Sequence, residues 1–365
     1  MANNVMRRHG GPPCSTSSEL PVIVIASSNQ LDNVGYRGGH LIVASSYPAD
    51  PTSFLARAEV VLAMQIDVTR RGSASNGDEM EPQRGRLEAF VHLLVRHIME
   101  GATSSLPSQS ARVAVVTGGN KEIGLEVCRQ LAADGITVVL TARDETRGVE
   151  AAERLRGMGL SSVVFHQLEV NNAAVGGMEY AQGVDNNEEQ GRETYDTAKN
   201  GVQTNYYGAK HVIQGLLPLL LSSSEGKIVN VSSALGLLRF LGNEDLRKEL
   251  DDIDNLTEER LDEVLASFLK DFEAGELEAH GWPMGSAAYK VAKVAMNAYT
   301  RISARKHPAL RINCAHPGYV KTDLTINSGF LTPEEGARNV VTVALLPDGG
   351  PTGAFFDEGK EASFV

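Results

Sequence analysis

Residues 112–124 read RVAVVTGGNKEIG, and a helix-like pattern, LEVCRQLAADG, follows them directly. The apolar, β-branched run that ends at Thr117 predicts a buried strand, and the two glycines after it predict a tight turn into the helix. Strand, glycine turn and helix together point backbone N–H groups and a helix N-terminus toward a phosphate. Taken alone, the stretch fits an ordinary turn equally well, because such glycine turns are common.

Strand-like and helix-like segments alternate from residue 111 to the C-terminus. The predicted strands are 112–117, 136–142, 162–170, 226–232 and 311–315, and the predicted helices are 125–134, 145–158, 192–221 and 287–306. Strands rich in valine and isoleucine, each followed by a helix, form a parallel sheet that is covered on both faces. We therefore predict an α/β fold with a doubly wound parallel sheet, the Rossmann fold, over residues 111–365.

Residues 1–110 differ from the rest of the chain in composition. They are rich in serine, glycine, proline and asparagine, and their short apolar runs, 22–26, 41–44 and 59–66, share no helix or strand period. We predict an N-terminal extension that is mostly irregular or disordered. A plastid transit peptide is the alternative, because the start carries Arg7 and Arg8 and has Glu19 as its first acidic residue.

The overall composition excludes several classes of protein. Of the 365 residues 42% are hydrophobic, which is ample for a core, and the net charge of −12 argues against nucleic acid as a partner. No apolar run approaches the roughly 18 residues of a membrane span. The three cysteines are far apart and odd in number, which argues against a disulfide framework and favours a reducing compartment, the cytoplasm.

Tyr289 and Lys293, in the stretch SAAYKVAK, lie one helical turn apart and therefore share a face of the predicted helix. A nearby ammonium favours the phenolate, so we expect Lys293 to lower the pKa of Tyr289 toward the working range and make it a general acid. Ser233 ends a predicted strand, where its hydroxyl could hold a substrate carbonyl or simply form a turn. Asn205 is a poor helix former inside a predicted helix, which suggests a polar task or a solvent-facing position.

Arg143 follows the second predicted strand, in the stretch TARD. An acidic residue at this place binds a ribose hydroxyl and favours NAD, whereas an arginine suits the additional phosphate of NADP. Lys121 in the glycine turn adds a second cation. Together with the glycine turn, these residues predict NADP(H), although each also fits an ordinary surface charge.

As an ordered set, these motifs resemble the short-chain dehydrogenase/reductase family over about residues 111–365. The matching stretches are TGGNKEIG (117–124), NNAA (171–174), Asn205, Ser233, Tyr289, Lys293 and PGYVKT (317–322). The resemblance implies an NADP(H)-dependent oxidoreductase that reduces a ketone or aldehyde, or oxidises the secondary alcohol. It further implies a small apolar, terpenoid-like substrate and no metal.

The resemblance also implies roles for the individual residues. Asn205 would hold a water and a backbone carbonyl in a proton relay, Ser233 would orient the substrate, Tyr289 would exchange the proton, and Lys293 would bind the nicotinamide ribose. The implied cofactor-binding residues are Thr117, Gly118, Asn120, Lys121, Ile123, Gly124, Arg143, Asn172, Lys293, Pro317, Gly318, Val320 and Thr322.

A long insertion, about residues 234–285, separates Ser233 from Tyr289. Within it, apolar residues at helical spacing predict an amphipathic helix that Thr257 caps and Gly275 ends. These apolar residues are Leu261, Val264, Leu265, Phe268, Leu269 and Phe272. Such an insertion resembles a plant branch of salutaridine- and menthone-type reductases, and also animal carbonyl reductases. The resemblance implies that this segment covers the substrate cleft and blocks the usual helix interface, which leaves a monomer.

Two features depart from the family pattern. Glu122 stands where a glycine is usual, and we expect a modest loss of cofactor affinity. The predicted strand 162–170 runs straight into the stretch 171–174, without the helix and strand that the family has between them, so one strand–helix unit is missing. We expect strand 162–170 to lie next to strand 112–117, because an empty central position would break two strand ladders. The alternative function is therefore a catalytically impaired remnant without an intact cofactor site.

Overall fold

The computed structural model describes residues 34–37, 40–43, 59–64, 112–168, 176 and 192–365. Among them, eight strands form one sheet in the order β10-β9-β8-β7-β3-β4-β5-β6. Neighbouring strands are parallel except for the antiparallel pair β9 and β10. The strands are β3 (Glu59–Met64), β4 (Arg112–Thr117), β5 (Thr137–Ala142), β6 (Val163–Gln167), β7 (Glu225–Val231), β8 (Arg311–His316), β9 (Phe355–Asp357) and β10 (Lys360–Ala362). Two further strands, β1 (Val34–Arg37) and β2 (His40–Val43), form a separate antiparallel pair.

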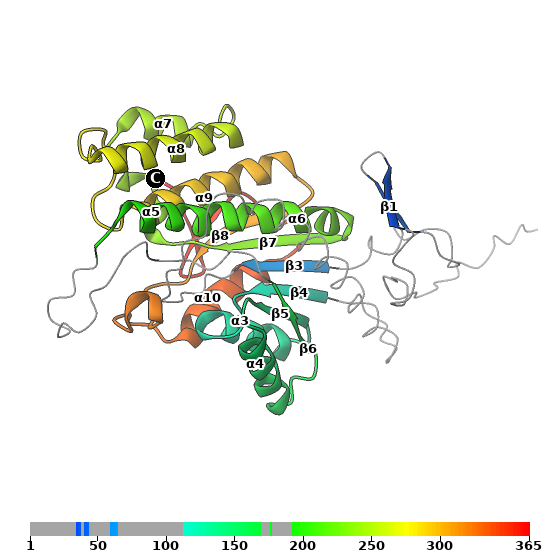
Figure 1. The fold of residues 1–365 in the computed structure, drawn as a ribbon. Coiled ribbons are helices and arrows are strands. Elements are labelled where there is room, and N and C mark those ends of the chain that lie inside the picture. Colours follow the sequence, from blue (N-terminus) through cyan, green and yellow to red (C-terminus); the bar gives the residue numbers. More distant parts are fainter. Residues whose placement is uncertain (1–33, 38–39, 44–58, 65–111, 169–175, 177–191) are drawn as a thin grey trace, which may run out of the picture.

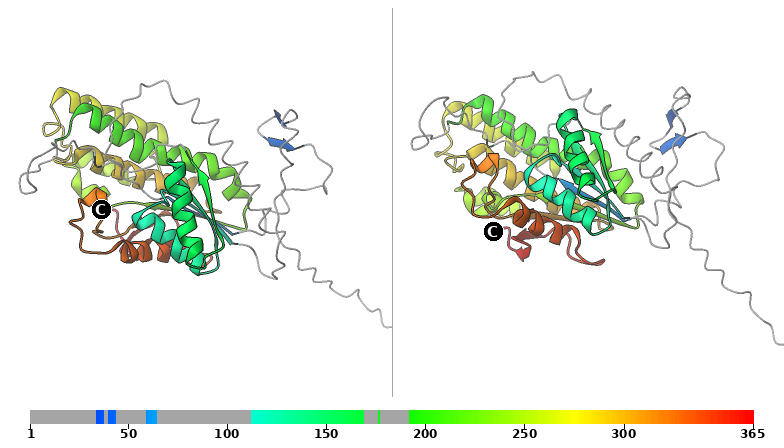
Figure 2. Two further views of the ribbon diagram at one scale, coloured as in Figure 1. Left: turned by 60° about the horizontal axis from the view of Figure 1, so that its bottom comes forward. Right: turned by 90° about the horizontal axis from the view of Figure 1, so that it is seen from below.

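Helices cover both faces of the eight-stranded sheet, as Figures 1 and 2 show from three directions. One face carries α3 (Glu122–Ala133), α4 (Glu145–Gly157) and α10 (Pro333–Ala344). The other face carries α5 (Tyr195–Val202), α6 (Ala209–Ser222) and α9 (Ala287–Lys306), with α7 (Glu244–Asp251) and α8 (Glu258–Ala274) outside them. None of the described helices is both long enough and apolar enough to cross a membrane.

The alternation of side chains along the central strands explains this layering. In β4, Val113 and Val115 belong to the core beneath α6 and α9, whereas Ala114 and Val116 belong to the core beneath α3 and α10. Successive strand residues point to opposite faces, so a strand that is apolar throughout must be covered on both. The predicted doubly wound α/β fold is confirmed.

The central position of the sheet, which we expected strand 162–170 to fill, is filled by β3. This strand comes from the apolar run at 59–66 and lies parallel between β4 and β7. Its six residues face 112–117 on one side and 225–230 on the other, so both ladders continue through it. As a result β6 lies in the outer position beside β5. Our expectation that strand 162–170 would lie beside strand 112–117 is therefore wrong.

The boundary that we placed at residue 110 stays a prediction, since most of the residues before it lie outside the described ranges. The exception that matters for the site is β3, which supplies a strand of the sheet. The stretch 171–174, including Asn172, also lies outside the described residues.

The single long helix predicted at 192–221 is divided into three segments. α5 and α6 are joined by a π-helical stretch, η2 (Gln203–Gly208), which contains Asn205. A π-helical turn adds a residue to the i→i−4 pattern and often occurs at functional sites. It also changes which side chains face the sheet, so a periodicity of 3.6 residues could not have predicted this break.

The insertion between Ser233 and Tyr289 contains the predicted amphipathic helix, α8. The Thr257 side chain accepts a hydrogen bond from the N–H of Arg260, and Gly275 ends the helix with a left-handed backbone, φ +74°. Both predicted helix ends are thus confirmed. The apolar stripe of α8 belongs to the core that α8 shares with α9.

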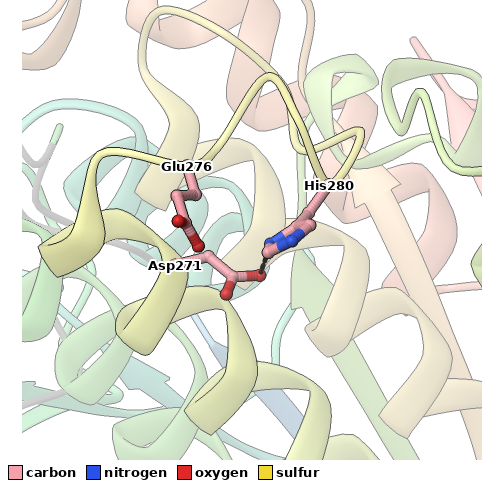
Figure 3. Close-up of side chains that lie close together, drawn as sticks. All are labelled: Asp271, Glu276 and His280. Carbon is pink, nitrogen blue, oxygen red and sulfur yellow. Dashed lines mark ion pairs between the residues drawn. The ribbon is translucent and has the colours of Figure 1, made fainter.

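Asp271, near the end of α8, fixes the segment that leads back to Tyr289 (Figure 3). Its Oδ2 accepts a hydrogen bond from Trp282 Nε1 at 2.8 Å and lies 2.8 Å from His280 Nδ1. Although burial raises the pKa of Asp271, these two hydrogen bonds lower it further than burial raises it. Glu276 also lies close to Asp271 and His280. The hydrogen bonds explain the position of the Asp271 carboxylate, which anchors the Trp282 ring. That ring packs on Phe268 with ring centroids 5.4 Å apart.

Candidate active site

The candidate residues gather at one edge of the sheet, where the parallel strands end. Thr117 ends β4, Ser233 follows β7 by two residues, and Pro317 follows β8 directly. The carboxyl ends of parallel strands share one edge, which is where open α/β sheets bind ligands. The fold therefore brings three separate motifs to one place.

Tyr289 and Ser233 are brought together by the first turn of α9 and the end of β7. The Ser233 side chain lies near the Tyr289 hydroxyl, close enough to lower the pKa of the phenol. Ser233 is buried, and its Oγ accepts the N–H of Leu235 at 3.1 Å. Since Oγ accepts that bond, the serine hydrogen remains for a second acceptor, such as the tyrosine oxygen or a bound carbonyl oxygen.

Lys293 lies one turn further along α9 and is completely buried. Its Nζ donates a hydrogen bond to the carbonyl of Val231 at 3.0 Å and lies 5.7 Å from the centre of the Tyr289 ring. Burial lowers the pKa of Lys293 to about 7. At physiological pH, a large fraction of the protein molecules therefore carries Lys293 as a neutral amine.

Burial also dominates the titration of Tyr289. It raises the pKa of this tyrosine to about 12, and the Ser233 side chain offsets only part of the increase. We expected Lys293 to lower the tyrosine pKa toward the working range, and that expectation is wrong for this structure. The physical reason is that removing both groups from water disfavours their charged forms, phenolate and ammonium alike.

Asn205 lies in η2, where its side chain is buried at 3% exposure. η2 packs against α9, the helix that carries Tyr289 and Lys293. Because the side chain is buried, the solvent-facing alternative for Asn205 is excluded. A buried amide also requires hydrogen-bond partners. Asn205, Ser233 and Lys293 are thus buried, whereas Tyr289 at the start of α9 is partly exposed.

The glycine turn has the close packing that a phosphate-binding loop needs. Gly118 has a left-handed backbone, φ +64°, and a Cβ on Gly119 would lie 2.7 Å from Leu140 Cγ. The N–H of Gly119 binds the carbonyl of Thr141 at 2.9 Å, which holds the turn over the end of β5. Asn120 Oδ1 is buried and has no hydrogen-bond partner.

The remaining residues of this motif begin α3. Ile123 and Gly124 are buried in its first turn, so the backbone N–H groups at the start of α3 lie next to the glycine turn. A buried acceptor, a tight glycine turn and a helix N-terminus fit a dinucleotide whose pyrophosphate takes the N–H groups. Arg143 is exposed directly after β5, and its backbone carbonyl accepts the side-chain amide of Gln167 at 2.8 Å.

Comparison with known proteins gives consistent matches. Residues 112–175 match a family model described as short chain dehydrogenase. The chain is 42% identical to salutaridine reductase of Papaver bracteatum over 69% of this chain and 96% of that protein, and 34% identical to carbonyl reductase [NADPH] 1 of Homo sapiens over 69% and 98%. The solved structure of salutaridine reductase from Papaver somniferum superposes with a TM-score of 0.62 at 41% identity, covering 67% of this chain and 99% of that one.

The chain is a short-chain dehydrogenase/reductase. Membership accounts for the motifs that gather at the carboxyl edge of the sheet, and it makes the protein an oxidoreductase. Menthone neomenthol reductase from Mentha piperita superposes with a TM-score of 0.60 at 38% identity, covering 68% of this chain and 99% of that one.

The stretch after β8 forms a loop at this edge of the sheet. Val320 and Thr322 are buried, and a Cβ on Gly318 (φ +93°) would lie 2.4 Å from Leu331 Cδ1. A backbone hydrogen bond closes the loop, since the N–H of Lys321 donates to the carbonyl of Leu331 at 2.8 Å. Pro317 is held in turn by Asn339, whose Nδ2 donates to its carbonyl at 3.0 Å.

Two residues of the glycine turn hold this loop from the opposite side. Lys121 Nζ lies 2.7 Å from Asp323 Oδ2, and Glu122 Oε1 accepts the backbone N–H of Asp323 at 2.7 Å. We name the three residues Lys121, Glu122 and Asp323 the clasp. Sequence reasoning missed Asp323, because no local pattern marks a residue whose partners lie 201 and 202 positions earlier.

The clasp explains the unusual glutamate at the start of α3. Glu122 has φ +50°, a conformation that suits glycine and strains other residues by roughly 1 kcal/mol. The hydrogen bond to Asp323 offsets a strain of that size. The glutamate thus turns its charge toward the loop rather than leaving it over the start of α3.

We predict that Glu122→Gly loosens the loop with little change in overall stability. Relief of backbone strain and loss of the hydrogen bond are both about 1 kcal/mol and oppose each other. Hydrogen exchange of residues 320–328 should become faster in the variant, while its melting temperature shifts by only a few degrees. Glu122→Gln is the control, since its amide oxygen can still accept the Asp323 N–H. Unchanged exchange in Glu122→Gly would show that the clasp does not hold the loop.

Proposed function

We propose that this protein is an NADP(H)-dependent carbonyl reductase or alcohol dehydrogenase that acts on a small apolar, terpenoid-like ketone, aldehyde or secondary alcohol. The observation that carries the proposal is the placement of Tyr289 near Ser233 at the edge of the sheet, with buried Lys293 one turn further along α9. Relatives named for ketone or alcohol substrates, such as (+)-neomenthol dehydrogenase of Capsicum annuum at 41% identity, support the substrate class.

Bound NADP(H) would supply or accept the hydride. The residues that would hold it are those of the glycine turn, Arg143, Lys293 and the 317–322 loop. Asn172, which lies outside the described residues, belongs to the same proposed set. The buried unpartnered Asn120 Oδ1 and the start of α3 support this assignment.

The side chains at the edge of the sheet divide the remaining work. Ser233 donates its hydrogen to the carbonyl oxygen and so orients the substrate. Tyr289, whose pKa is raised to about 12 by burial, is protonated at neutral pH and can give its proton to the oxygen as negative charge develops. A protonated phenol is the form that carbonyl reduction needs, so the free enzyme carries the proton for reduction near pH 7.

Lys293 and Asn205 serve the tyrosine from the interior. Lys293 would bind the nicotinamide ribose, and on contact with those hydroxyls its ammonium form would regain hydrogen bonds that burial removes. Asn205 would hold a water and a backbone carbonyl in a proton relay between the buried lysine and solvent. The packing of η2 on α9 supports that role.

The proposal is tested by oxidation of NADPH, followed at 340 nm, with a panel of cyclic monoterpene ketones that includes menthone. Turnover with NADPH supports the proposal, and absence of turnover with every ketone and aldehyde contradicts it. The competing hypothesis is an impaired remnant, in which a missing strand–helix unit would leave no intact cofactor site. The presence of β3 in the central position favours the active enzyme, and submillimolar binding of NADPH in a titration would argue against the remnant.

We predict that Arg143→Ala weakens NADPH binding about 10- to 100-fold and leaves NADH binding unchanged. A charge-assisted hydrogen bond to a phosphate is worth roughly 1.5–3 kcal/mol, which corresponds to that range. Arg147→Ala is the matched control, because Arg147 is an exposed arginine on α4 that faces Asp144. The measurement is a fluorescence titration with both cofactors, and an equal loss for NADH would remove Arg143 from the phosphate site.

We further propose a monomeric protein of the cytoplasm. α8 packs on α5 and α9 and so covers helices of the face opposite α3. Lys210 of α6 fastens α8 through Asp262 at 3.0 Å and Glu258 at 3.5 Å. Analytical ultracentrifugation tests the oligomeric state, and a stable dimer or tetramer would contradict the proposal.

A further inference from the structure

The helix that carries Tyr289 and Lys293 begins without a cap from its own neighbouring residue. α9 starts at Ala287, and the preceding Ser286 has a left-handed backbone with φ +50° and makes no capping hydrogen bond. A capping side chain normally requires an extended backbone. Ala287 and Ala288 are both completely buried, so water cannot readily satisfy their N–H groups.

A distant carboxylate takes both of these N–H groups. Glu193 Oε2 accepts the N–H of Ala287 at 2.9 Å, and its Oε1 accepts the N–H of Ala288 at 3.0 Å. The two residues are 94 and 95 positions further along the chain. A negative charge at a helix N-terminus is also favoured by the helix dipole. Glu193 therefore closes the start of α9 from another part of the fold.

The backbone of Glu193 is itself held by the start of α5. The next residue, Thr194, caps α5 through a hydrogen bond from Thr197 N–H at 3.3 Å and a reciprocal one from Thr194 N–H to Thr197 Oγ1 at 2.9 Å. α5 continues into η2, which carries Asn205. Since α5 and α9 pack side by side on one face of the sheet, Glu193 connects the starts of two neighbouring helices (Figure 1).

We propose that Glu193 is a positioning residue for the reaction, an inference that rests on the function proposed above. Tyr289 is the residue directly after Ala288, so the carboxylate determines where the first turn of α9 places the phenol relative to Ser233 and to η2. Glu193 acts through the backbone and does not contact the tyrosine hydroxyl. Misplacement of a reacting group by about 1 Å can reduce a rate about 100-fold.

The test compares Glu193→Ala with Glu193→Gln and with Thr257→Ala. The glutamine keeps an oxygen acceptor for the helix start. Thr257→Ala removes a cap of similar energy from α8, whose first residue, Glu258, lies 2.7 Å from Lys306 at the far end of α9 from Tyr289. Each variant is measured for thermal stability, for NADPH affinity, and for kcat and KM with menthone or the best ketone of the panel.

We expect Glu193→Ala to lower kcat about 10- to 100-fold, with KM and the NADPH dissociation constant changed less than about threefold. Glu193→Gln should recover most of the lost kcat. Thr257→Ala should lower the melting temperature about as much as Glu193→Ala and leave kcat within twofold of the wild type. A wild-type kcat in Glu193→Ala, or an equal loss of kcat in Thr257→Ala, would overturn the proposal.

A second readout does not depend on turnover. In the cofactor-free protein, the ring signal of Tyr289 in a ¹³C-tyrosine NMR spectrum, assigned by its loss in Tyr289→Phe, should shift in Glu193→Ala and not in Thr257→Ala. Hydrogen exchange at residues 287–288 should become faster in Glu193→Ala alone. If the wild type shows no turnover but these shifts occur, the proposed function fails while the positioning of Tyr289 by Glu193 stands. Unchanged Tyr289 signals in Glu193→Ala would refute that positioning.

Discussion

Tyr289→Phe is expected to reduce kcat for ketone reduction by about 10³-fold or more while the protein keeps its fold and its NADPH affinity. The substitution removes one oxygen, which lies near the Ser233 side chain and is the group proposed to give a proton to the substrate. General acid catalysis contributes roughly 10²- to 10⁴-fold, and phenylalanine has no proton to give in its place. The measurement is single-turnover and steady-state oxidation of NADPH.

The chain supplies a matched control on the same helix. Tyr299 also lies on α9, is buried, and has a pKa that burial raises, but its ring faces Tyr206 with centroids 6.1 Å apart. Tyr299→Phe therefore removes the same atom from the same helix, far from Ser233. We expect it to lower stability by about 1 kcal/mol and to leave kcat within about twofold. Equal loss of activity in the two variants would mean that α9 is sensitive as a whole and that Tyr289 has no special role.

The pH dependence of the reaction follows from the same residue. Because burial raises the pKa of Tyr289 to about 12, its hydroxyl stays protonated at neutral and moderately alkaline pH. We therefore attribute any loss of reduction near pH 7–8 to a group other than Tyr289, and Lys293 is the buried site group that titrates there.

Local pattern was sufficient to predict several elements of the fold. The strand 112–117 and the helix 287–306 have the same bounds in the structure as in the prediction, and Thr257 and Gly275 bound α8 as expected. Each of these depends on apolar periodicity or on capping within a few residues. The pairing of Tyr289 with Ser233 required more, and it was predicted from the family resemblance.

The features that the sequence did not predict all depend on contacts between distant residues. The run at 59–66 was visible as an apolar segment, but its place between β4 and β7 depends on which two ladders it completes, and nothing within the run specifies that. Glu193 and Asp323 resemble any charged residue in a polar stretch until the fold brings them to Ala287 and Glu122. The expected effect of Lys293 on Tyr289 was wrong because sequence spacing shows that two groups are close and does not show how far both are removed from water.

Lys293→Met is expected to remove most of the activity and at the same time to stabilise the protein at neutral and acidic pH. The ammonium is completely buried, and its folded-state pKa of about 7 lies well below the value of 10.5 for an exposed lysine. Below pH 7 the folded protein must therefore hold a desolvated charge, which costs free energy that methionine of similar length does not. Lys293→Met also loses the hydrogen bond to the Val231 carbonyl, which reduces the expected stabilisation by only about 1–3 kcal/mol.

The sign of the pH dependence distinguishes this explanation from simple repacking. Between pH 7 and 10.5 the unfolded chain binds more protons at Lys293 than the folded one, so this group makes the unfolding free energy rise by about 1.4 kcal/mol for each pH unit. The advantage of Lys293→Met should accordingly be largest near pH 6.5 and shrink by pH 8.5, as measured by urea unfolding of the cofactor-free protein. Lys210→Met is the control, because Lys210 is also buried but pairs with Asp262 and Glu258, so its loss breaks two ion pairs and should destabilise the protein at every pH in this range. If Lys293→Met were destabilised to the same extent as Lys210→Met, Lys293 would stabilise the fold. That result would contradict our explanation that the buried charge of Lys293 lowers stability and is kept for its role beside Tyr289.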